Sequence, residues 1–257
     1  MSRTKALSLY LIGAFTQIGA ACIMVYLLRS AGTVVDFSTL PGLIAVAVGG
    51  TSTAIWGSVA AYRYFHRKPL RILTDFFKFR QSISDYALAA VFLVLDFLPL
   101  LFGGKLNIVA WYLPFVLFAK MLLFGGIEEI GWRYIFQPIL EEKLGYIFST
   151  LITFISWGVW HFAFFYIDGT LAGMSGAEML WFSLGLLTNC FILSALYNRS
   201  KNLWLCAMTH ALINVLSLMA VGGSRAATLV CQAAIIVIAV VVSRKSRIQA
   251  GKLTDEN

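Results

Sequence analysis

Two adjacent carboxylates and a guanidinium interrupt a long apolar stretch in the middle of the chain. Glu128, Glu129 and Arg133 follow a run of apolar residues that begins near Leu106. Charged side chains at membrane depth are costly, so they commonly mark sites of function. Carboxylates can take up and release protons, and cationic groups can stabilise developing charge, which is the chemistry that hydrolysis requires.

The spacing of these three residues predicts a role for each. On a helix, Glu129 and Arg133 are four residues apart, share a face and are predicted to pair. Glu128 points about 100° away from Glu129 and is predicted to face a cavity. A carboxylate in an apolar cavity can exchange a proton near neutral pH, so Glu128 is the candidate general base that activates a water. The alternative is a purely structural ion cluster at the membrane edge.

Two further apolar segments carry one histidine each. His161 follows Trp157 by one helical turn, and Asn214 follows His210 by the same spacing. The histidines could orient a water, and the Asn214 amide could donate to an oxyanion. Equally, Glu128, His161 and His210 could hold a zinc ion with an open coordination position. A single membrane histidine is often only an interhelix contact, but two of them beside the acidic motif favour a hydrolytic site.

The composition predicts that membrane helices position these groups. The chain has 257 residues, of which 60% are hydrophobic and 12% charged, and a mean hydropathy of +0.82. A spanning helix needs about 20 apolar residues, and its backbone must be hydrogen-bonded within the segment. We predict an all-α, polytopic membrane helical bundle of about eight transmembrane helices, with the catalytic site within the bundle and residues 1–257 as a single integral membrane domain. The predicted spans are 6–28, 40–62, 85–103, 107–127, 147–167, 179–197, 203–222 and 226–243.

The net charge of +8 predicts topology rather than nucleic-acid binding. With eight spans, most Lys and Arg residues fall on one side of the membrane, and only Arg29, Lys105 and Arg225 fall on the other. This asymmetry places both termini in the cytoplasm and predicts contact between the basic side and anionic lipid. Basic and apolar residues alternate in the loop 63–85, which predicts either an amphipathic segment on the inner membrane face or a solvated loop.

The three motifs together resemble the CAAX protease and bacteriocin-processing family, also called Abi. The resemblance covers about residues 85–243. It implies an eight-span intramembrane endopeptidase in which Glu128 activates the attacking water, His161, His210 and Asn214 complete the site, and Glu129 and Arg133 support it. Members have been described both as metalloproteases and as metal-independent glutamate proteases, so the cofactor is either zinc or none. The chain departs from the family pattern at Trp157, where phenylalanine is usual, and at Tyr134, where glycine is common.

We also expect a partner and a location. An intramembrane site suits a membrane-associated or lipidated peptide as substrate. The compact single-domain form suggests a prokaryotic plasma membrane, and the positions of Glu128 and His210 in their spans predict a site that opens towards the cytoplasmic half of the membrane. Three alternatives remain. They are a non-proteolytic scaffold or immunity protein, a proton-coupled transporter with Asp96 and Lys120 in a relay, and a serine protease using Ser175, whose sequence context resembles the rhomboid motif. A transporter would be favoured by an inverted repeat, and the sequence contains no visible one.

Overall fold

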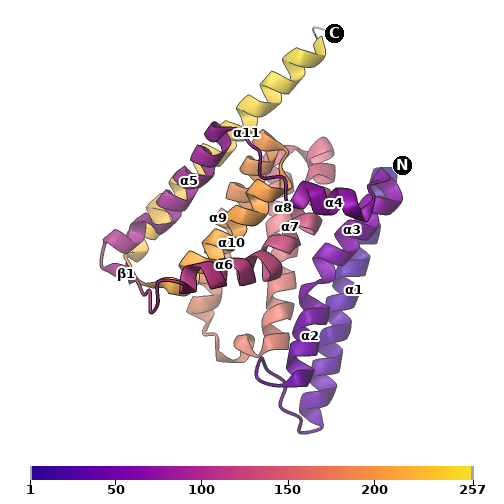
Figure 1. Ribbon diagram of the computed structural model, residues 1–257, viewed down its shortest axis with the longest axis vertical. Helices are drawn as coiled ribbons and strands as arrows, with labels where there is room; N and C mark the ends of the chain where they lie inside the picture. The colour runs from indigo at the N-terminus through magenta and orange to yellow at the C-terminus, as the bar shows by residue number, and fades with distance from the viewer. Residues whose placement is uncertain (1, 256–257) are drawn as a thin grey trace.

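The computed structural model describes the backbone of residues 2–255 and the side chains of residues 3–244. Helices make up nearly all of the regular structure (Figure 1), which confirms the predicted all-α membrane bundle. The helices are α1 (Ser2–Ser30), α2 (Leu40–Gly50), α3 (Ser52–Phe65), α4 (Pro69–Phe76), α5 (Ile83–Phe97), α6 (Leu113–Phe124), α7 (Glu129–Gly131), α8 (Gln137–Asp168), α9 (Gly176–Ser200), α10 (Leu203–Met219) and α11 (Arg225–Asp255).

Within the described residues, five helical segments are long and apolar enough to cross a membrane. They are Arg3–Ser30, Leu40–Phe65, Ile83–Leu101, Gly176–Ser200 and Arg225–Arg244. Each overlaps a predicted span, and two contain an irregularity. The second joins α2 to α3 through Thr51, and the third extends α5 by a 3-10 turn at Leu98–Leu101. The predicted spans 107–127, 147–167 and 203–222 are not among these five.

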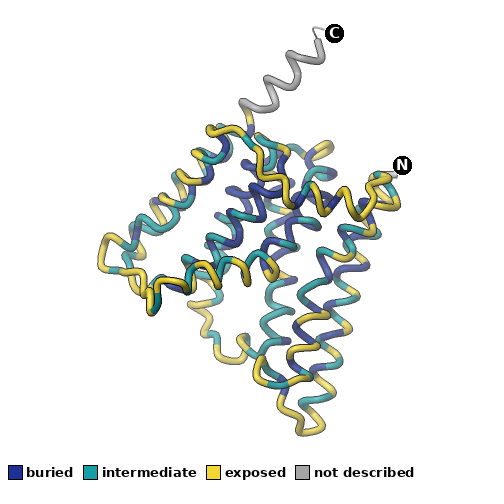
Figure 2. The backbone as a smooth tube through the Cα atoms, in the orientation of Figure 1, coloured by how far each residue is buried: buried dark blue, intermediate teal, exposed yellow. Residues whose placement is uncertain are grey.

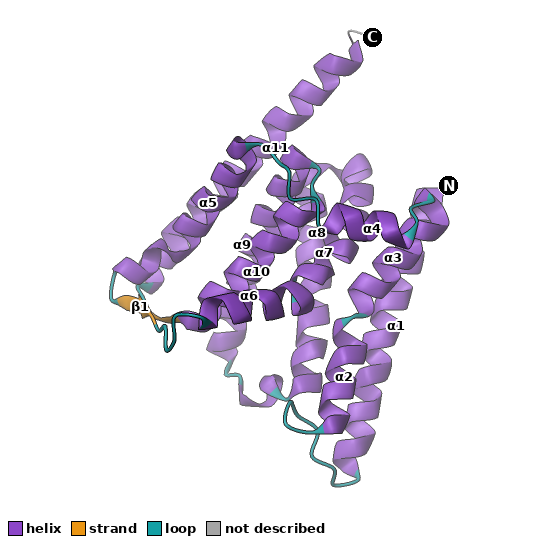
Figure 3. Ribbon diagram, in the orientation of Figure 1, coloured by secondary structure: helices purple, strands orange, loops and turns teal. Residues whose placement is uncertain are grey.

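A short ribbon of two antiparallel strands explains two of these differences. Strand β1 (Gly104–Leu106), in the gap between two predicted spans, pairs with β2 (Ala220–Gly222), which replaces the end of the predicted span 203–222 (Figure 3). α10 therefore ends at Met219 and has 17 residues. α6 begins only at Leu113, with a proline in its first turn, and has 12 residues. A helix of that length extends about 18 Å, against the roughly 30 Å of a hydrocarbon core.

The direction of α6 decides how the acidic motif enters the molecule. α6 lies across the bundle rather than along it (Figure 1). It packs against α10 and leads directly into the segment that carries Glu128. The segment with Glu128 and Glu129 therefore enters the bundle from its side, and does not continue a helix that crosses the whole membrane.

The predicted span 147–167 corresponds to the second part of α8. α8 is interrupted at Gly145, whose φ of 76° and ψ of 174° lie outside the helical region. Glycine adopts a positive φ without the steric penalty of a Cβ atom. The chain then continues as helix to Asp168, and this part carries Trp157 and His161.

The core of the bundle lies between its central helices. Buried residues concentrate along α8, α9, α10 and the region of α7 (Figure 2). α1 packs against α2, α3 and α8 on one flank, and α11 packs against α9 and α5 on the other. Large apolar side chains on the outer helices stay exposed, among them Ile12, Leu40 and Val230, as expected where a helix contacts lipid tails.

The basic, apolar segment between the second and third spans forms a helix, α4, as the amphipathic prediction required. It buries Ile72 and Phe76 against the protein and exposes Leu70 and Leu73. A short helix with one face in the core and apolar residues also on its outer face fits a position at the membrane interface.

Candidate active site

The acidic motif lies on three short helical pieces of different pitch. A 3-10 turn (Gly126–Glu128) is followed by the single turn α7 and then by a π-helix (Trp132–Phe136). Such π-helical turns are rare and frequently occur at functional sites. Glu128 is 4% exposed, and Glu129 and Arg133 are 0% exposed. The charges are therefore in the interior of the bundle, which argues against the alternative of an ion cluster at its edge.

Glu129 links the acidic motif to α10. Its Oε2 lies 3.4 Å from Nε of Arg133, as the spacing of the two residues predicted. Its Oε1 accepts a hydrogen bond from Nδ1 of His210 at 2.8 Å. In a neutral imidazole a proton on Nδ1 leaves Nε2 as an acceptor, so Glu129 sets which nitrogen of His210 is available for chemistry.

Trp157 on α8 is the common neighbour of the predicted site residues. Its indole Nε1 donates a hydrogen bond to Oε2 of Glu128 at 2.7 Å. Its ring centre lies 5.1 Å from that of His161 and 5.2 Å from that of His210. The guanidinium carbon of Arg133 lies 4.6 Å from the same ring. The tryptophan that departs from the family pattern therefore supplies a hydrogen-bond donor that phenylalanine lacks.

A cavity of about 280 Å³ lies between α8, α9 and α10. His161, His210 and Asn214 line it together with Trp157, whereas Glu128 is not among the described residues that form its wall. It extends to Trp181 near the start of α9 and to Ser217 near the end of α10. These helix ends are opposite those that carry Lys201 and Asn202. The cavity therefore lies towards the end of the bundle away from the basic residues. We had expected the site to open on the basic, cytoplasmic side, and the position of this cavity differs from that expectation.

Gly125 allows α10 to approach the acidic motif closely. A Cβ atom at this position would lie 2.5 Å from Nδ2 of Asn214 and 3.2 Å from Nε2 of His210. Both nitrogens thus face the same glycine and lie near each other. At Gly126 a Cβ atom would lie 3.1 Å from the carbonyl oxygen of Ala207. The glycine pair thus permits close packing, and it also lies directly after the end of α6 at Phe124.

The structure thus brings the predicted site residues together in two connected groups. Glu128, His161 and Arg133 surround Trp157, and Glu129, His210 and Asn214 meet beside Gly125. Several residues of the cavity wall were not predicted from the sequence, and one of them carries an amide. Asn189 on α9 also lines the cavity, and its amide within a predicted apolar span was the signal that could have identified it.

The predicted zinc ligands do not form a metal site as they are placed. Across the part of the chain that the structure describes, no group of three or more His, Cys, Asp or Glu residues is positioned to hold a metal ion. One carboxylate oxygen of Glu128 is bound to Trp157, and Nδ1 of His210 is bound to Glu129. Glu128, His161 and His210 therefore do not fit zinc in this arrangement, and we derive no chemical step through a metal.

The residues proposed for a serine protease and for a transporter lie away from this cavity. Ser175 is the N-cap of α9, where its Oγ accepts from the backbone N–H of Glu178 and also donates to the Glu178 carboxylate. Lys120 is exposed on α6, and Asp96 is half-buried on α5. None of these three side chains is among the described residues that line the cavity of His161 and His210.

Comparison with known proteins gives one family match, which covers the central part of the chain. No curated protein matches the chain significantly. Residues 109–216 match the protein-family model described as "Type II CAAX prenyl endopeptidase Rce1-like". The matched range includes every site residue predicted from the sequence, from Glu128 to Asn214, and supports an intramembrane endopeptidase in general. Residues 109–216 therefore match a model of the CAAX protease and bacteriocin-processing family, as the resemblance of the three motifs predicted.

Proposed function

We propose that this protein is an intramembrane endopeptidase that hydrolyses a peptide bond with a water activated by Glu128. The observation that carries the proposal is the 2.7 Å hydrogen bond from Trp157 Nε1 to Oε2 of Glu128. This bond orients a buried carboxylate beside an indole that both histidines also contact. A general base must be held within hydrogen-bond reach of the water from which it takes a proton.

In the proposed reaction, Glu128 takes a proton from the water as the water oxygen attacks the carbonyl carbon of the scissile bond. His210 Nε2 accepts a hydrogen bond from the same water and orients it. The Asn214 amide donates to the oxyanion of the tetrahedral intermediate. The protonated Glu128 then gives its proton to the leaving nitrogen, the carbon–nitrogen bond breaks, and a new carboxyl group and a new amine are released.

A second assignment of the base fits the same reaction. His210 lines the cavity, and Glu129 binds its Nδ1 as the aspartate binds the histidine in a catalytic triad. In this arrangement His210 Nε2 would take the proton from the water and Glu128 would only stabilise charge. The two assignments differ in which substitution abolishes the chemical step.

The deciding experiment uses purified protein in detergent and a library of quenched fluorescent peptides. Wild type is compared with Glu128→Gln, Glu128→Ala and His210→Ala. We expect cleavage by the wild type and loss of cleavage in all three variants. Cleavage that survives both alanine substitutions would refute the assignment, and an active Glu128→Gln variant beside an inactive His210→Ala variant would transfer the role of base to His210. Ion flux in liposomes without cleavage would favour a transporter, and peptide binding without cleavage would favour a scaffold or immunity protein.

For the substrate we propose a membrane-associated or lipidated peptide. The matched family is described by a prenyl endopeptidase activity, and a site within a helical bundle suits a peptide that lies at the membrane. A prenylated peptide should be cleaved faster than the same peptide without its lipid, and equal rates would count against the proposal. Inductively coupled plasma analysis of active protein, with activity before and after chelation, tests whether zinc is required.

For the location we propose a prokaryotic plasma membrane with both termini in the cytoplasm. The excess of Lys and Arg on the connections that precede α5 and α10 supports this topology. Epitope tags at the two ends should be labelled by antibody only after spheroplasts are permeabilised. Labelling of either tag in intact spheroplasts would contradict the orientation.

A further inference from the structure

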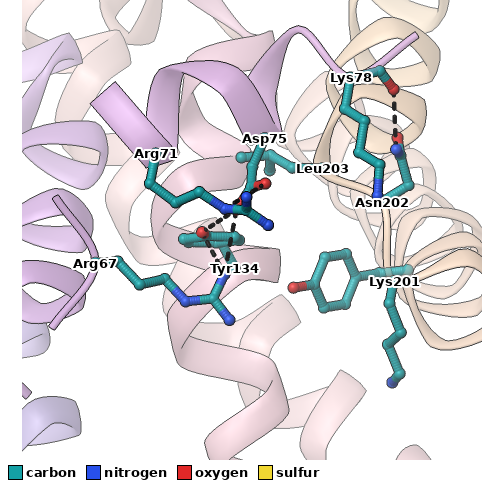
Figure 4. A pocket seen from close by; sticks show the side chains of 9 residues that line it. Arg67, Arg71, Asp75, Lys78, Tyr134, Lys201, Asn202 and Leu203 are labelled. Atoms are coloured by element: carbon teal, nitrogen blue, oxygen red, sulfur yellow. Dashed lines mark hydrogen bonds and ion pairs between the residues drawn. The ribbon is translucent and has the colours of Figure 1, made fainter. Parts of the chain in front are cut away.

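A second cavity, of about 340 Å³, lies at the end of α10 opposite the candidate active site (Figure 4). Its charged lining consists of Arg67, Arg71, Lys78 and Lys201 against the single carboxylate of Asp75. Four positive charges and one negative charge give a net charge of +3. None of these residues takes part in the proposed peptidase chemistry. A ligand of this cavity would therefore be a different molecule from the peptide substrate.

The cavity lies where several membrane spans end. Arg67 comes two residues after the span Leu40–Phe65, and Lys201 directly follows the span Gly176–Ser200. Lys78 precedes the span that begins at Ile83 by five residues. Residues immediately outside the ends of spanning helices lie at the level of the lipid headgroups. α4, which exposes Leu70 and Leu73, forms one wall of the cavity at this level.

The two arginines at the cavity are held by a network around Asp75 (Figure 4). The Asp75 carboxylate accepts hydrogen bonds from the hydroxyl of Tyr134 at 2.6 Å and from Nη1 of Arg67 at 3.3 Å, and lies 3.2 Å from Nε of Arg71. The Arg67 guanidinium also donates to the Tyr134 hydroxyl and lies 4.5 Å above its ring. Two guanidinium groups are thus positioned before any ligand arrives, which lowers the ordering cost of binding one.

The opposite wall adds a helix N-terminus and an anchored lysine. α10 begins at Leu203, and its N-cap residue Asn202 lines the cavity. The positive end of a helix dipole favours an anion at this position. The side-chain amide of Asn202 donates to the backbone carbonyl of Lys78 at 3.0 Å, which fixes the chain segment that carries the Lys78 ammonium.

We propose that this cavity binds the phosphate group of an anionic membrane lipid. Guanidinium groups match phosphate in planar, bidentate geometry, and basic pockets between transmembrane helices bind anionic headgroups. The position at the span ends, beside an interfacial helix with exposed apolar residues, favours a lipid as the source of the phosphate over a soluble compound. The experiment separates the two sources.

The test measures lipid binding by native mass spectrometry of the full-length protein released from detergent micelles. The probes are dioctanoyl phosphatidylglycerol, dioctanoyl phosphatidylcholine and inorganic phosphate. The variant Arg71→Gln/Lys78→Gln removes two cavity charges. The control Arg63→Gln/Lys68→Gln removes two exposed charges from the same region that do not line the cavity.

We expect wild type to bind phosphatidylglycerol more tightly than phosphatidylcholine and inorganic phosphate. The cavity variant should bind phosphatidylglycerol about 25-fold more weakly, since each of the two basic residues near an anionic headgroup contributes about fivefold. The control should change its affinity by less than about twofold, because charges outside the cavity act only through screened, long-range attraction.

Three outcomes would overturn the proposal. They are equal binding of the two lipids, equal weakening in both double variants, and inorganic phosphate binding as tightly as phosphatidylglycerol, which would make the ligand a soluble one. If size-exclusion chromatography shows that the cavity variant does not fold, the single variant Lys78→Gln replaces it in the test. This variant should fold, because the hydrogen bond from Asn202 goes to the backbone of Lys78 and is kept when the side chain changes. Its expected loss is about fivefold, and no loss would again refute the lipid site.

Discussion

Glu129 accepts a hydrogen bond from Nδ1 of His210 at 2.8 Å, across 81 positions of sequence. The second glutamate of the acidic pair therefore bonds directly to an imidazole, whereas the first accepts its hydrogen bond from the indole of Trp157. The other oxygen of Glu129 faces Arg133 at 3.4 Å. Glu129 is consequently both the counter-ion of a buried guanidinium and the group that orients His210, and substitutions can separate these two roles.

The Glu129→Gln variant should fold and lose activity. The amide keeps the size of the carboxylate but no longer stabilises the same tautomer of His210, so kcat/KM should fall about 10- to 100-fold, as for other groups that orient a catalytic ligand. Both substitutions remove the counter-ion of Arg133, but Glu129→Ala should destabilise the protein more, by about 3–5 kcal/mol, because it also leaves the buried guanidinium without the acceptor oxygen that an amide retains. Peptide cleavage and thermal unfolding measure the two effects.

The control for both substitutions is Glu142→Gln. Glu142 pairs with Arg3, and the side chains are 44% and 55% exposed, so losing this pair should cost at most about 1 kcal/mol. A Glu129→Gln variant as active as this control would show that Glu129 has only a structural role.

Trp157→Phe should lower kcat more than it changes KM. The substitution preserves the aromatic contacts with His161 and His210 but removes the hydrogen bond to Glu128. A hydrogen bond to a charged group contributes about 1.5–3 kcal/mol, so kcat should fall about 10- to 100-fold.

Trp160→Phe is the matched control for Trp157→Phe. Trp160 is also buried in α8 and its ring centre also lies 5.1 Å from that of His161, but its indole donates a hydrogen bond to Ser52 at 2.9 Å and not to Glu128. Its loss should reduce stability but leave kcat within about twofold of the wild type, because a neutral hydrogen bond contributes only about 1 kcal/mol to folding. Equal kcat values for the two variants would remove Trp157 from the mechanism.

Gly125→Ala should inactivate the enzyme without removing any polar group. The new Cβ atom would lie 2.5 Å from Nδ2 of Asn214, which must then move together with its neighbour His210. A displacement of about 1 Å at a reacting centre can cost about 100-fold in rate. Gly19→Ala is the control, since a Cβ atom there meets no described atom within 4 Å. Normal turnover by Gly125→Ala would show that the positions of Asn214 and His210 are not critical.

Asn189→Ala should weaken catalysis with little effect on folding. The Asn189 amide lines the cavity, where it can bind the backbone of an extended peptide. Loss of one such hydrogen bond should lower kcat/KM about tenfold. Thr188→Val, at the neighbouring buried position whose hydroxyl bonds to its own helix at Leu184, should leave kcat/KM unchanged. An unchanged kcat/KM in Asn189→Ala would remove this residue from the substrate path.

The sequence predicted those parts of the site that local geometry determines. The i, i+4 spacing of Glu129 and Arg133 determines their pairing wherever the segment is helical. By contrast, the hydrogen bond between Trp157 and Glu128 depends on how two distant helices pack, and no local pattern contains that information. The chemistry of the three motifs and their order were sufficient to indicate the family that residues 109–216 match, but not to decide which glutamate would contact which histidine.

The predicted spans that differ from the observed helices differ for a similar physical reason. Hydropathy measures how apolar a segment is, and it does not separate a helix that crosses the membrane from one that lies inside the protein. α6 and α10 are both apolar, yet α10 ends at Met219 where β2 begins, and α6 begins only at Leu113, after β1 and the loop that follows it. The pairing of β1 with β2 joins residues more than 100 positions apart, so it could not be predicted from either segment alone.

Ser175→Ala should retain full peptidase activity and lose stability. A serine peptidase that used this residue as its nucleophile would be inactive after the change, whereas a helix cap contributes only to folding. Removal of an N-cap serine costs about 1 kcal/mol, and asparagine caps a helix about as well as serine does. Ser175→Asn should therefore recover most of the lost stability, although it has no hydroxyl. Cleavage rates equal to wild type in both variants, with a lowered melting temperature only in Ser175→Ala, would assign Ser175 to the capping of α9. Loss of cleavage in both variants would instead place a nucleophilic serine in a protein for which we propose a water-activating glutamate.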